Sequence, residues 1–300
     1  MVEDPHTILG KYGDNIISYY GRSIYAIHGT EKNKIFKNGH YLNSAVLYKN
    51  KVYGIPATNV YEYNLDTLEV KKVTENKHDL SYFSNRGEDL YIVTKVYKSQ
   101  NQKENGTSYF KVTDKGLVET YSIYNISGIS DEMAVKDGIF LATCATDKDV
   151  VAEGNQLLYV KDGETIMIDQ DYYYDLIGLM DGNLLYYKND YLYGTFDENR
   201  KTFYLYDGKE SKEAFDLDVG YFEYLVGYEY DGGILLQVEY ECDTKLYKYD
   251  GKKVEEVQLP ENLYYIVDFA VVEDKAYISY TEGEESFTIL GTVIDNLSAS

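Results

Sequence analysis

LYKYDGKK, at residues Leu246–Lys253, recurs in variant form along the whole chain. In each copy an aromatic, strand-like run leads into a turn marked by Asp or Asn. Asp-Gly readily takes the positive φ of a tight hairpin turn, so the apolar residues on either side are predicted to form two antiparallel strands. The other copies are FYLYDGK at Phe203–Lys209, LYVKDGE at Leu158–Glu164, YFKVTDKG at Tyr109–Gly116, YEYNLDT at Tyr61–Thr67 and IFKNG at Ile35–Gly39.

The spacing of these turns predicts the fold class. The turn residues lie 28, 48, 48, 45, 43 and 45 residues apart, near the period of a four-stranded propeller blade, and they are Asn38, Asp66, Asp114, Asp162, Asp207, Asp250 and Asp295. A second series of turns, each followed by an apolar run such as IFLATC from Ile139, also gives seven repeats. We therefore expect an all-β, seven-bladed β-propeller of four-stranded antiparallel blades, in one domain over residues 1–300. The short first interval leaves six blades as the alternative.

The two ends of the sequence suggest how such a propeller would close. The last repeat has only Asp295–Ser300 left for an outer strand, whereas Thr7–Tyr12 is strand-like and unassigned. We predict that Thr7–Tyr12 pairs into the last blade, which would close the ring and remove an exposed sheet edge.

Composition excludes some partners. The formal net charge of −22 argues against nucleic acid and against an anionic membrane surface, because both are bound by clustered Lys and Arg. The acidic excess serves solubility or favours a cationic partner. No apolar run reaches 18 residues and Met1–Gly10 lacks the charged-then-apolar pattern of a leader, so we expect neither a transmembrane span nor a signal peptide in this sequence. Cys144 and Cys242 fall in non-neighbouring repeats, so we expect two free thiols.

Aromatic residues concentrate where one predicted blade crosses to the next. Together with the long loops between second and third strands, these crossings should form one face of the propeller, and functional residues tend to lie on such loops. Tyrosines with nearby carboxylates suit stacking on sugars, burial of a partner's side chains or binding of a cation, although such rings also pack between blades. The candidate binding residues are Tyr124, Tyr172, Tyr173, Tyr174, Asp175, Tyr221, Phe222, Tyr264 and Tyr265.

Signals for catalysis or a cofactor are weak. Two acidic stretches could offer oxygen ligands to calcium, namely Asp147, Asp149 and Glu153, and Asp169, Asp171 and Asp175, but neither has the spacing of a calcium-binding loop. The four histidines form no zinc-ligand pair, and the chain contains neither a G-x-S-x-G elbow nor a glycine-rich phosphate loop. We therefore predict no cofactor and no catalytic residue. A carboxylate pair that includes Asp175 remains open.

Units such as LYKYDGKKVEEV and VYEYNLDTLEVKKV resemble the Tyr-rich, sequence-divergent propellers of surface proteins and lipoproteins of Gram-positive bacteria. This resemblance implies an extracellular or cell-surface binding domain, with a cytoplasmic location still open. We expect a monomeric, non-enzymatic module that binds a glycan or a protein partner. The alternatives are a carbohydrate-active enzyme, either a glycoside hydrolase or a polysaccharide lyase, and a structural scaffold.

Overall fold

A computed structural model describes fourteen stretches of the chain. They are residues 7–29, 31–56, 59–74, 81–84, 89–96, 106–124, 129–143, 155–189, 200–218, 224–240, 243–259, 265–272, 275–281 and 288–294. All regular structure in them is β-strand, and they contain no helix that is long and apolar enough to cross a membrane. Compact contacts divide the chain into unit one, residues 1–83, 243–246 and 256–300, and unit two, residues 84–242 and 247–255.

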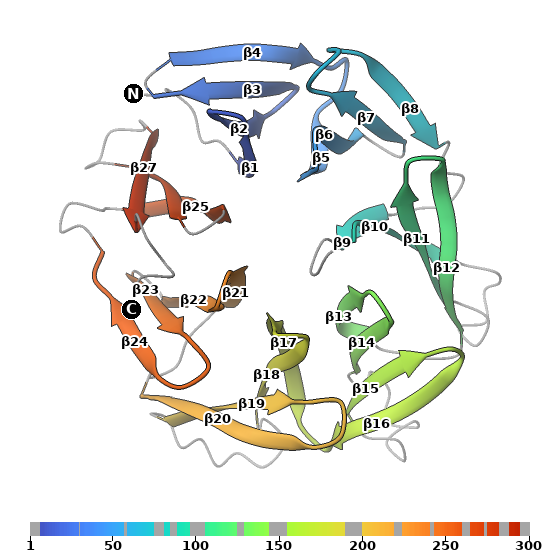
Figure 1. The fold of residues 1–300 in the computed structure, drawn as a ribbon, viewed down its shortest axis with the longest axis vertical. Coiled ribbons are helices and arrows are strands. Elements are labelled where there is room, and N and C mark those ends of the chain that lie inside the picture. Colours follow the sequence, from blue (N-terminus) through green and yellow to red (C-terminus); the bar gives the residue numbers. More distant parts are fainter. Residues whose placement is uncertain are drawn as a thin grey trace. The chain divides into compact units, whose positions relative to one another are not determined.

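The strands form seven sheets in chain order, each built from consecutive antiparallel strands (Figure 1). First strands are β1 (Thr7–Tyr12), β5 (Leu42–Tyr48), β9 (Ser81–Ser84), β13 (Ile129–Val135), β17 (Tyr173–Met180), β21 (Tyr224–Tyr230) and β25 (Tyr265–Val272). Second strands are β2 (Asn15–Tyr20), β6 (Lys51–Pro56), β10 (Tyr91–Val96), β14 (Gly138–Thr143), β18 (Asn183–Asn189), β22 (Gly233–Tyr240) and β26 (Lys275–Thr281).

Third strands are β3 (Ser23–His28), β7 (Val60–Asn64), β11 (Gly106–Thr113), β15 (Gln156–Lys161), β19 (Arg200–Tyr206), β23 (Asp243–Tyr249) and β27 (Thr288–Ile294). Fourth strands are β4 (Glu31–Lys37), β8 (Val70–Thr74), β12 (Gly116–Tyr124), β16 (Glu164–Gln170), β20 (Ser211–Asp218) and β24 (Val254–Val257). The all-β fold of four-stranded antiparallel blades is thus confirmed. Six sheets have four strands each and are complete blades, which agrees with the alternative prediction of six blades. The seventh sheet, β25–β27, has three strands in the described residues. Seven four-stranded blades are not supported.

Burial follows the position of a strand in its sheet. Every residue of β14 is buried, whereas β16 is largely exposed. A second strand is covered on both faces by its neighbours, so its sequence is continuously apolar, whereas a fourth strand alternates with charged residues. Side chains between neighbouring sheets complete the core. One such cluster in unit two contains Met133, Phe140, Leu176 and Tyr186, from sheets β13–β16 and β17–β20.

The turn chemistry predicted from the sequence is largely correct. Asp66, Asp114, Asp162, Asp207 and Asp250 all lie between a third and a fourth strand. In the last two of these turns the Asp carboxylate accepts hydrogen bonds from the backbone N–H groups two and three residues ahead, and the following glycine has a φ of +87°. Asp295 lies outside the described residues.

The prediction for the N-terminal sheet is wrong. Thr7–Tyr12 is the first strand of the first sheet and pairs with β2, not with the last sheet. Asn38 consequently lies in the crossing from β4 to β5, which explains the short first interval. A tight hairpin at Gly13 closes a loop of few residues and costs little chain entropy, which favours this local pairing. The first sheet still meets the last one in unit one, since Ile8, Ile16 and Ile27 pack against Ala270 and Tyr277.

Candidate functional site

The structure describes only part of the predicted aromatic site. Tyr221, Phe222 and Tyr264 lie outside the described residues. Tyr124 ends β12, a fourth strand, and Tyr265 begins β25, but their side chains are not described. The remaining four residues are consecutive at the crossing from β16 into β17, and these are Tyr172, Tyr173, Tyr174 and Asp175. We therefore build the candidate site at this crossing, which belongs to unit two.

Alternation along β17 separates these side chains. Tyr174 is buried, with 3% of its surface exposed, and belongs to the core between sheets β13–β16 and β17–β20. Its ring meets that of Tyr186 at a centroid distance of 6.1 Å, and burial raises the pKa of its hydroxyl. Tyr174 thus packs between two sheets, which is the alternative to binding that the sequence analysis gave for the aromatic residues. Asp175, one residue later, is exposed to solvent.

The Asp175 side chain is exposed to solvent, yet nearby protein atoms displace part of the water around its carboxylate. The resulting loss of solvation, together with the charge of Asp131, raises the pKa of Asp175 to about 6. Directly opposite on β18 lies the buried Tyr187, whose pKa is raised by burial and by Asp175. The structure shows no hydrogen bond to Asp175 from the described residues. A cation near this carboxylate would therefore relieve an unfavourable negative charge.

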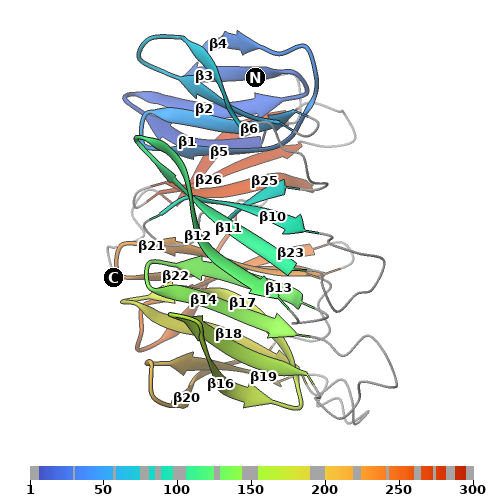
Figure 2. The ribbon, with the colours of Figure 1, turned by 90° about the vertical axis from the view of Figure 1, so that its right-hand side faces the viewer.

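Asp131, on β13, is held in place by backbone groups. Its Oδ2 accepts a hydrogen bond of 2.8 Å from the N–H of Leu176, and its Oδ1 accepts one of 2.8 Å from the N–H of Glu132. Figure 2 shows β13 and β17 side by side, as their contacts require. Both hydrogen bonds orient the Asp131 carboxylate, and its charge contributes to the raised pKa of Asp175.

Glu132 points away from this pair, toward sheet β9–β12. The hydroxyl of the fully buried Tyr109 donates a hydrogen bond to Glu132 Oε2, while Oε1 is buried and has no hydrogen-bond partner among the described residues. Burial raises the pKa of Glu132 to about 7. Neither Asp131 nor Glu132 was among the predicted site residues. The sequence feature that could have indicated them is a pair of adjacent carboxylates within a predicted strand, because neighbouring side chains of a strand point to opposite faces of the sheet.

Lys188 occupies the space beside Tyr172. Its Nζ lies 4.6 Å from the Tyr172 ring centroid, 4.3 Å from that of Tyr204 and 3.1 Å from Asp169 Oδ2. Two aromatic faces and a carboxylate thus surround one ammonium group, a combination that favours cations. Asp169 and Asp171 were predicted as weak calcium ligands, but Asp169 already binds Lys188. In the described part of the chain no three His, Cys, Asp or Glu residues form a metal site.

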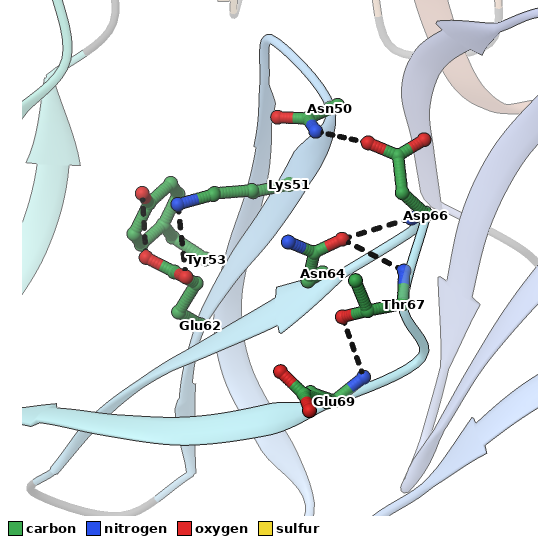
Figure 3. A network of polar contacts seen from close by, with 8 residues as sticks. All are labelled: Asn50, Lys51, Tyr53, Glu62, Asn64, Asp66, Thr67 and Glu69. Atoms are coloured by element: carbon green, nitrogen blue, oxygen red, sulfur yellow. Dashed lines mark hydrogen bonds and ion pairs between the residues drawn. The ribbon is translucent and has the colours of Figure 1, made fainter. Parts of the chain in front are cut away.

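A second polar network lies in unit one, at the turns of sheet β5–β8 (Figure 3). Asp66 accepts hydrogen bonds from the Asn50 amide and from the Tyr12 hydroxyl of the neighbouring sheet. Glu62 accepts one of 3.0 Å from Tyr53 and pairs with Lys51 at 3.0 Å. Each carboxylate is matched by donors of the chain itself, so this network serves the turns rather than a ligand.

Comparisons with known proteins identify the fold. The chain matches no protein-family model, and no curated protein is similar to it in sequence. The β-propeller domain of the Trilobed protease from Pyrococcus furiosus, described as having an open velcro topology, superposes with a TM-score of 0.69 at 15% identity, over 99% of this chain and 98% of that one. This chain has the β-propeller fold.

Other solved propellers belong to different kinds of protein. Acylaminoacyl peptidase from Pyrococcus horikoshii gives a TM-score of 0.66 at 14% identity over 98% of this chain, which spans about half (51%) of that one. Oligogalacturonate lyase from Vibrio parahaemolyticus gives 0.65 at 10% identity, over 96% of this chain and 90% of that one. The extracellular domain of a hybrid two-component system from B. thetaiotaomicron gives 0.57 at 10% identity, over 97% and 38%. At these identities the likeness extends to the fold alone.

Proposed function

We propose that this chain is a non-enzymatic binding module that acts as a monomer and receives a cationic group of a protein partner at Asp175. The observation that carries the proposal is the state of this carboxylate. Asp175 is exposed, and its pKa is raised by loss of solvation and by the charge of Asp131. A lysine or arginine side chain of a partner would neutralise this pair at an exposed position.

The tyrosines favour a protein over a glycan. Stacking on a sugar requires an exposed, flat aromatic face. Tyr174 is buried, and Lys188 lies over the ring of Tyr172, where a neutral sugar that displaced it would leave Asp169 without its ion pair. The net charge of −22 supports a basic partner through long-range attraction. An extracellular location is part of the proposal, supported by the resemblance to bacterial surface propellers and by the extracellular domain among the similar structures.

Arrays of basic peptides and of glycans, probed with the purified protein, test this function. The matched variants are Asp175→Asn, which removes the charge at constant shape, and Asp171→Asn, which removes an exposed carboxylate four residues away. We expect binding to basic peptides that Asp175→Asn weakens about tenfold, as for the loss of one charge-assisted contact, and that Asp171→Asn leaves unchanged. Binding should also weaken as the pH falls through about 6, where Asp175 takes up a proton.

Two results would contradict the proposal. One is equal binding by the wild type and Asp175→Asn. The other is binding to the glycan array alone, which would favour a glycan over a protein as the ligand.

The raised carboxyl pKa values favour a second candidate function, a carbohydrate-active enzyme. A carboxyl whose pKa is raised toward neutral pH can act as a general acid, and the pKa is about 6 for Asp175 and about 7 for Glu132. Of these, Asp175 is the exposed group and Glu132 is bonded to Tyr109. Incubation with oligogalacturonate and with any glycan bound on the array tests this function. Product formation that Asp175→Asn abolishes would support the enzyme over the binding module.

A further inference from the structure

The lysine at the β16–β17 crossing has an unusual environment. Lys188 lies over two aromatic rings, 4.6 Å from the ring centroid of Tyr172 and 4.3 Å from that of Tyr204, whereas Lys248 lies farther, at 5.9 Å, from that of Tyr230. Tyr172, Tyr204 and Asp169 come from the crossing, from β19 and from β16, so three separate segments converge on one ammonium group. We call Tyr172, Tyr204 and Asp169 the cation cage.

The walls of the cation cage do not depend on Lys188 for their position. Tyr204 stacks on the fully buried Tyr186 with a centroid distance of 5.6 Å and an interplanar angle of 25°. Tyr172 packs edge-on against the buried Tyr174, at 6.4 Å and 73°. Both supporting rings belong to the hydrophobic core of unit two. Removal of the lysine side chain would therefore leave the two aromatic faces where they are.

The carboxylate is anchored in the same way. Asp169 Oδ1 accepts a hydrogen bond of 2.9 Å from the N–H of Gln170, and Oδ2 accepts one of 3.4 Å from the hydroxyl of Tyr186 in addition to the contact with Lys188. Without Lys188, this partly buried negative charge would have no cation beside it from the part of the chain that the structure describes. It would attract another cation of similar size.

The cation cage is also reachable from solvent. The side chains of Lys188 and Asp169 are each 22% exposed, so the ion pair is partly shielded but not sealed. An exchange between the internal ammonium and an external one requires only that the lysine side chain rotate outward.

From this geometry we infer that the cation cage is a binding site for an alkylammonium group and that Lys188 is its internal, displaceable occupant. Two aromatic faces and a carboxylate are the surroundings that recognise quaternary ammonium groups. Such a group is present both in N-methylated lysine side chains and in choline headgroups. The site is distinct from Asp175, so this inference stands or falls independently of the proposed function.

Isothermal titration calorimetry with tetramethylammonium chloride, against sodium chloride as the blank, tests the inference. A tethered ammonium competes at an effective concentration of about millimolar or more, so the wild type should bind weakly. Lys188→Ala removes the competitor and should bind at least about tenfold more tightly than the wild type. Lys188→Thr, which suits a strand, serves the same purpose should the alanine variant fold poorly.

Matched controls separate the cage from a general charge effect. Lys248→Ala removes a lysine that lies 5.9 Å from the ring of Tyr230, outside the cation cage, and should bind no more tightly than the wild type. Adding Tyr204→Leu to Lys188→Ala keeps an apolar side chain but removes one aromatic face, and it should abolish the gain. Trimethyllysine amide and phosphocholine then distinguish the source. Whichever binds more tightly identifies a modified protein side chain or a headgroup as the natural ligand type.

The inference is overturned if a folded Lys188→Ala or Lys188→Thr variant binds tetramethylammonium no more tightly than the wild type. An equal gain in Lys248→Ala would overturn it as well. It also fails if both Lys188 variants are unfolded and tetramethylammonium does not restore their thermal unfolding transition.

Discussion

The carboxylate of Asp131 accepts a hydrogen bond of 2.8 Å from the backbone N–H of Leu176, 45 residues away on the neighbouring sheet. From the sheet on the other side, Glu229 Oε1 accepts one of 2.7 Å from the N–H of Leu179. The register of β17 shifts between Leu176 and Gly178, so these two N–H groups flank a β-bulge. A bulge interrupts the ladder and leaves backbone groups unpaired, and here two carboxylates from neighbouring sheets satisfy the adjacent donors.

Loss of either carboxylate should therefore weaken the contact between sheets. Asp131→Ala removes the hydrogen bond between this carboxylate and the N–H of the buried Leu176, and we expect a loss of about 1–3 kcal/mol in the free energy of unfolding, measured by urea denaturation. Glu229→Ala should cost a similar amount. Asp137→Ala is the control, because that side chain is 67% exposed and its ion pair with Lys161 spans 3.9 Å. Equal stability of Asp131→Ala and Asp137→Ala would show that the interaction contributes nothing.

Gly227 is required by close contact between sheets. A Cβ atom at this position would lie 2.3 Å from the carbonyl oxygen of Ile177, so one backbone would have to move. We expect Gly227→Ala to lower the free energy of unfolding by more than about 2 kcal/mol, or to prevent folding. Gly39→Ala is the matched control, since nothing lies within 4 Å of its Cβ position. If both variants unfold at the wild-type temperature, the packing at Gly227 is looser than described.

The partly buried Glu132 should make stability depend on pH. Its folded-state pKa is raised from 4.5 to about 7, so the folded protein holds this proton to a higher pH than the unfolded chain does. The contribution is fully present below 4.5 and is lost as the pH rises through about 7. It amounts to about 3 kcal/mol at most.

Urea denaturation of the wild type and of Glu132→Gln over this pH range measures that contribution. The stability of the wild type relative to the variant should fall as the pH rises through the window. Tyr109→Phe removes the hydrogen bond that favours the ionised carboxylate and should extend the fall to higher pH. A difference between wild type and Glu132→Gln that stays constant with pH would mean that Glu132 is ionised throughout.

The turn between β7 and β8 offers two opposite substitutions. Asn64 Oδ1 accepts hydrogen bonds from the N–H groups of Asp66 and Thr67, at 2.9 and 3.0 Å, so Asn64→Ala should cost about 1 kcal/mol. Leu68 has a φ of +57° and is 58% exposed, so Leu68→Gly relieves strain without loss of packing. We expect a gain of up to about 1 kcal/mol. Thermal unfolding of the two variants should give midpoints on either side of the wild type.

Local features of the sequence were enough to predict most of the fold. Asp207-Gly208 and Asp250-Gly251 marked turns correctly because the geometry of a tight turn is set by a few adjacent residues. Asn38-Gly39 gave a wrong turn assignment for the same reason. It has the residues of such a turn but lies in a crossing, and the first sheet begins instead with Thr7–Tyr12. The choice between two local hairpins depends on which pairing buries more side chains, which a turn signal does not contain.

The candidate site could be predicted only in part. The run Tyr172–Asp175 was singled out, but sequence alone did not show that Tyr174 packs inward while Asp175 stays exposed. Nothing in the sequence indicated a role for Lys188 or Tyr204, because a lysine or tyrosine within a strand is also typical of its solvent-facing side. Their meeting with Tyr172 and Asp169 depends on how β16, β18 and β19 lie against one another.

By itself, the sequence determined that this chain is an all-β repeat protein of antiparallel blades, because turns and the alternation of apolar residues are properties of neighbouring positions. Only the tertiary structure decided which sheet takes the N-terminal strand, which tyrosines are buried, and which carboxylates meet a cation, a backbone N–H or solvent. Those outcomes depend on contacts between residues far apart in the chain. Desolvation and charge pairing act through space, so the pKa of Asp175 and the surroundings of Lys188 exist only once the sheets have packed.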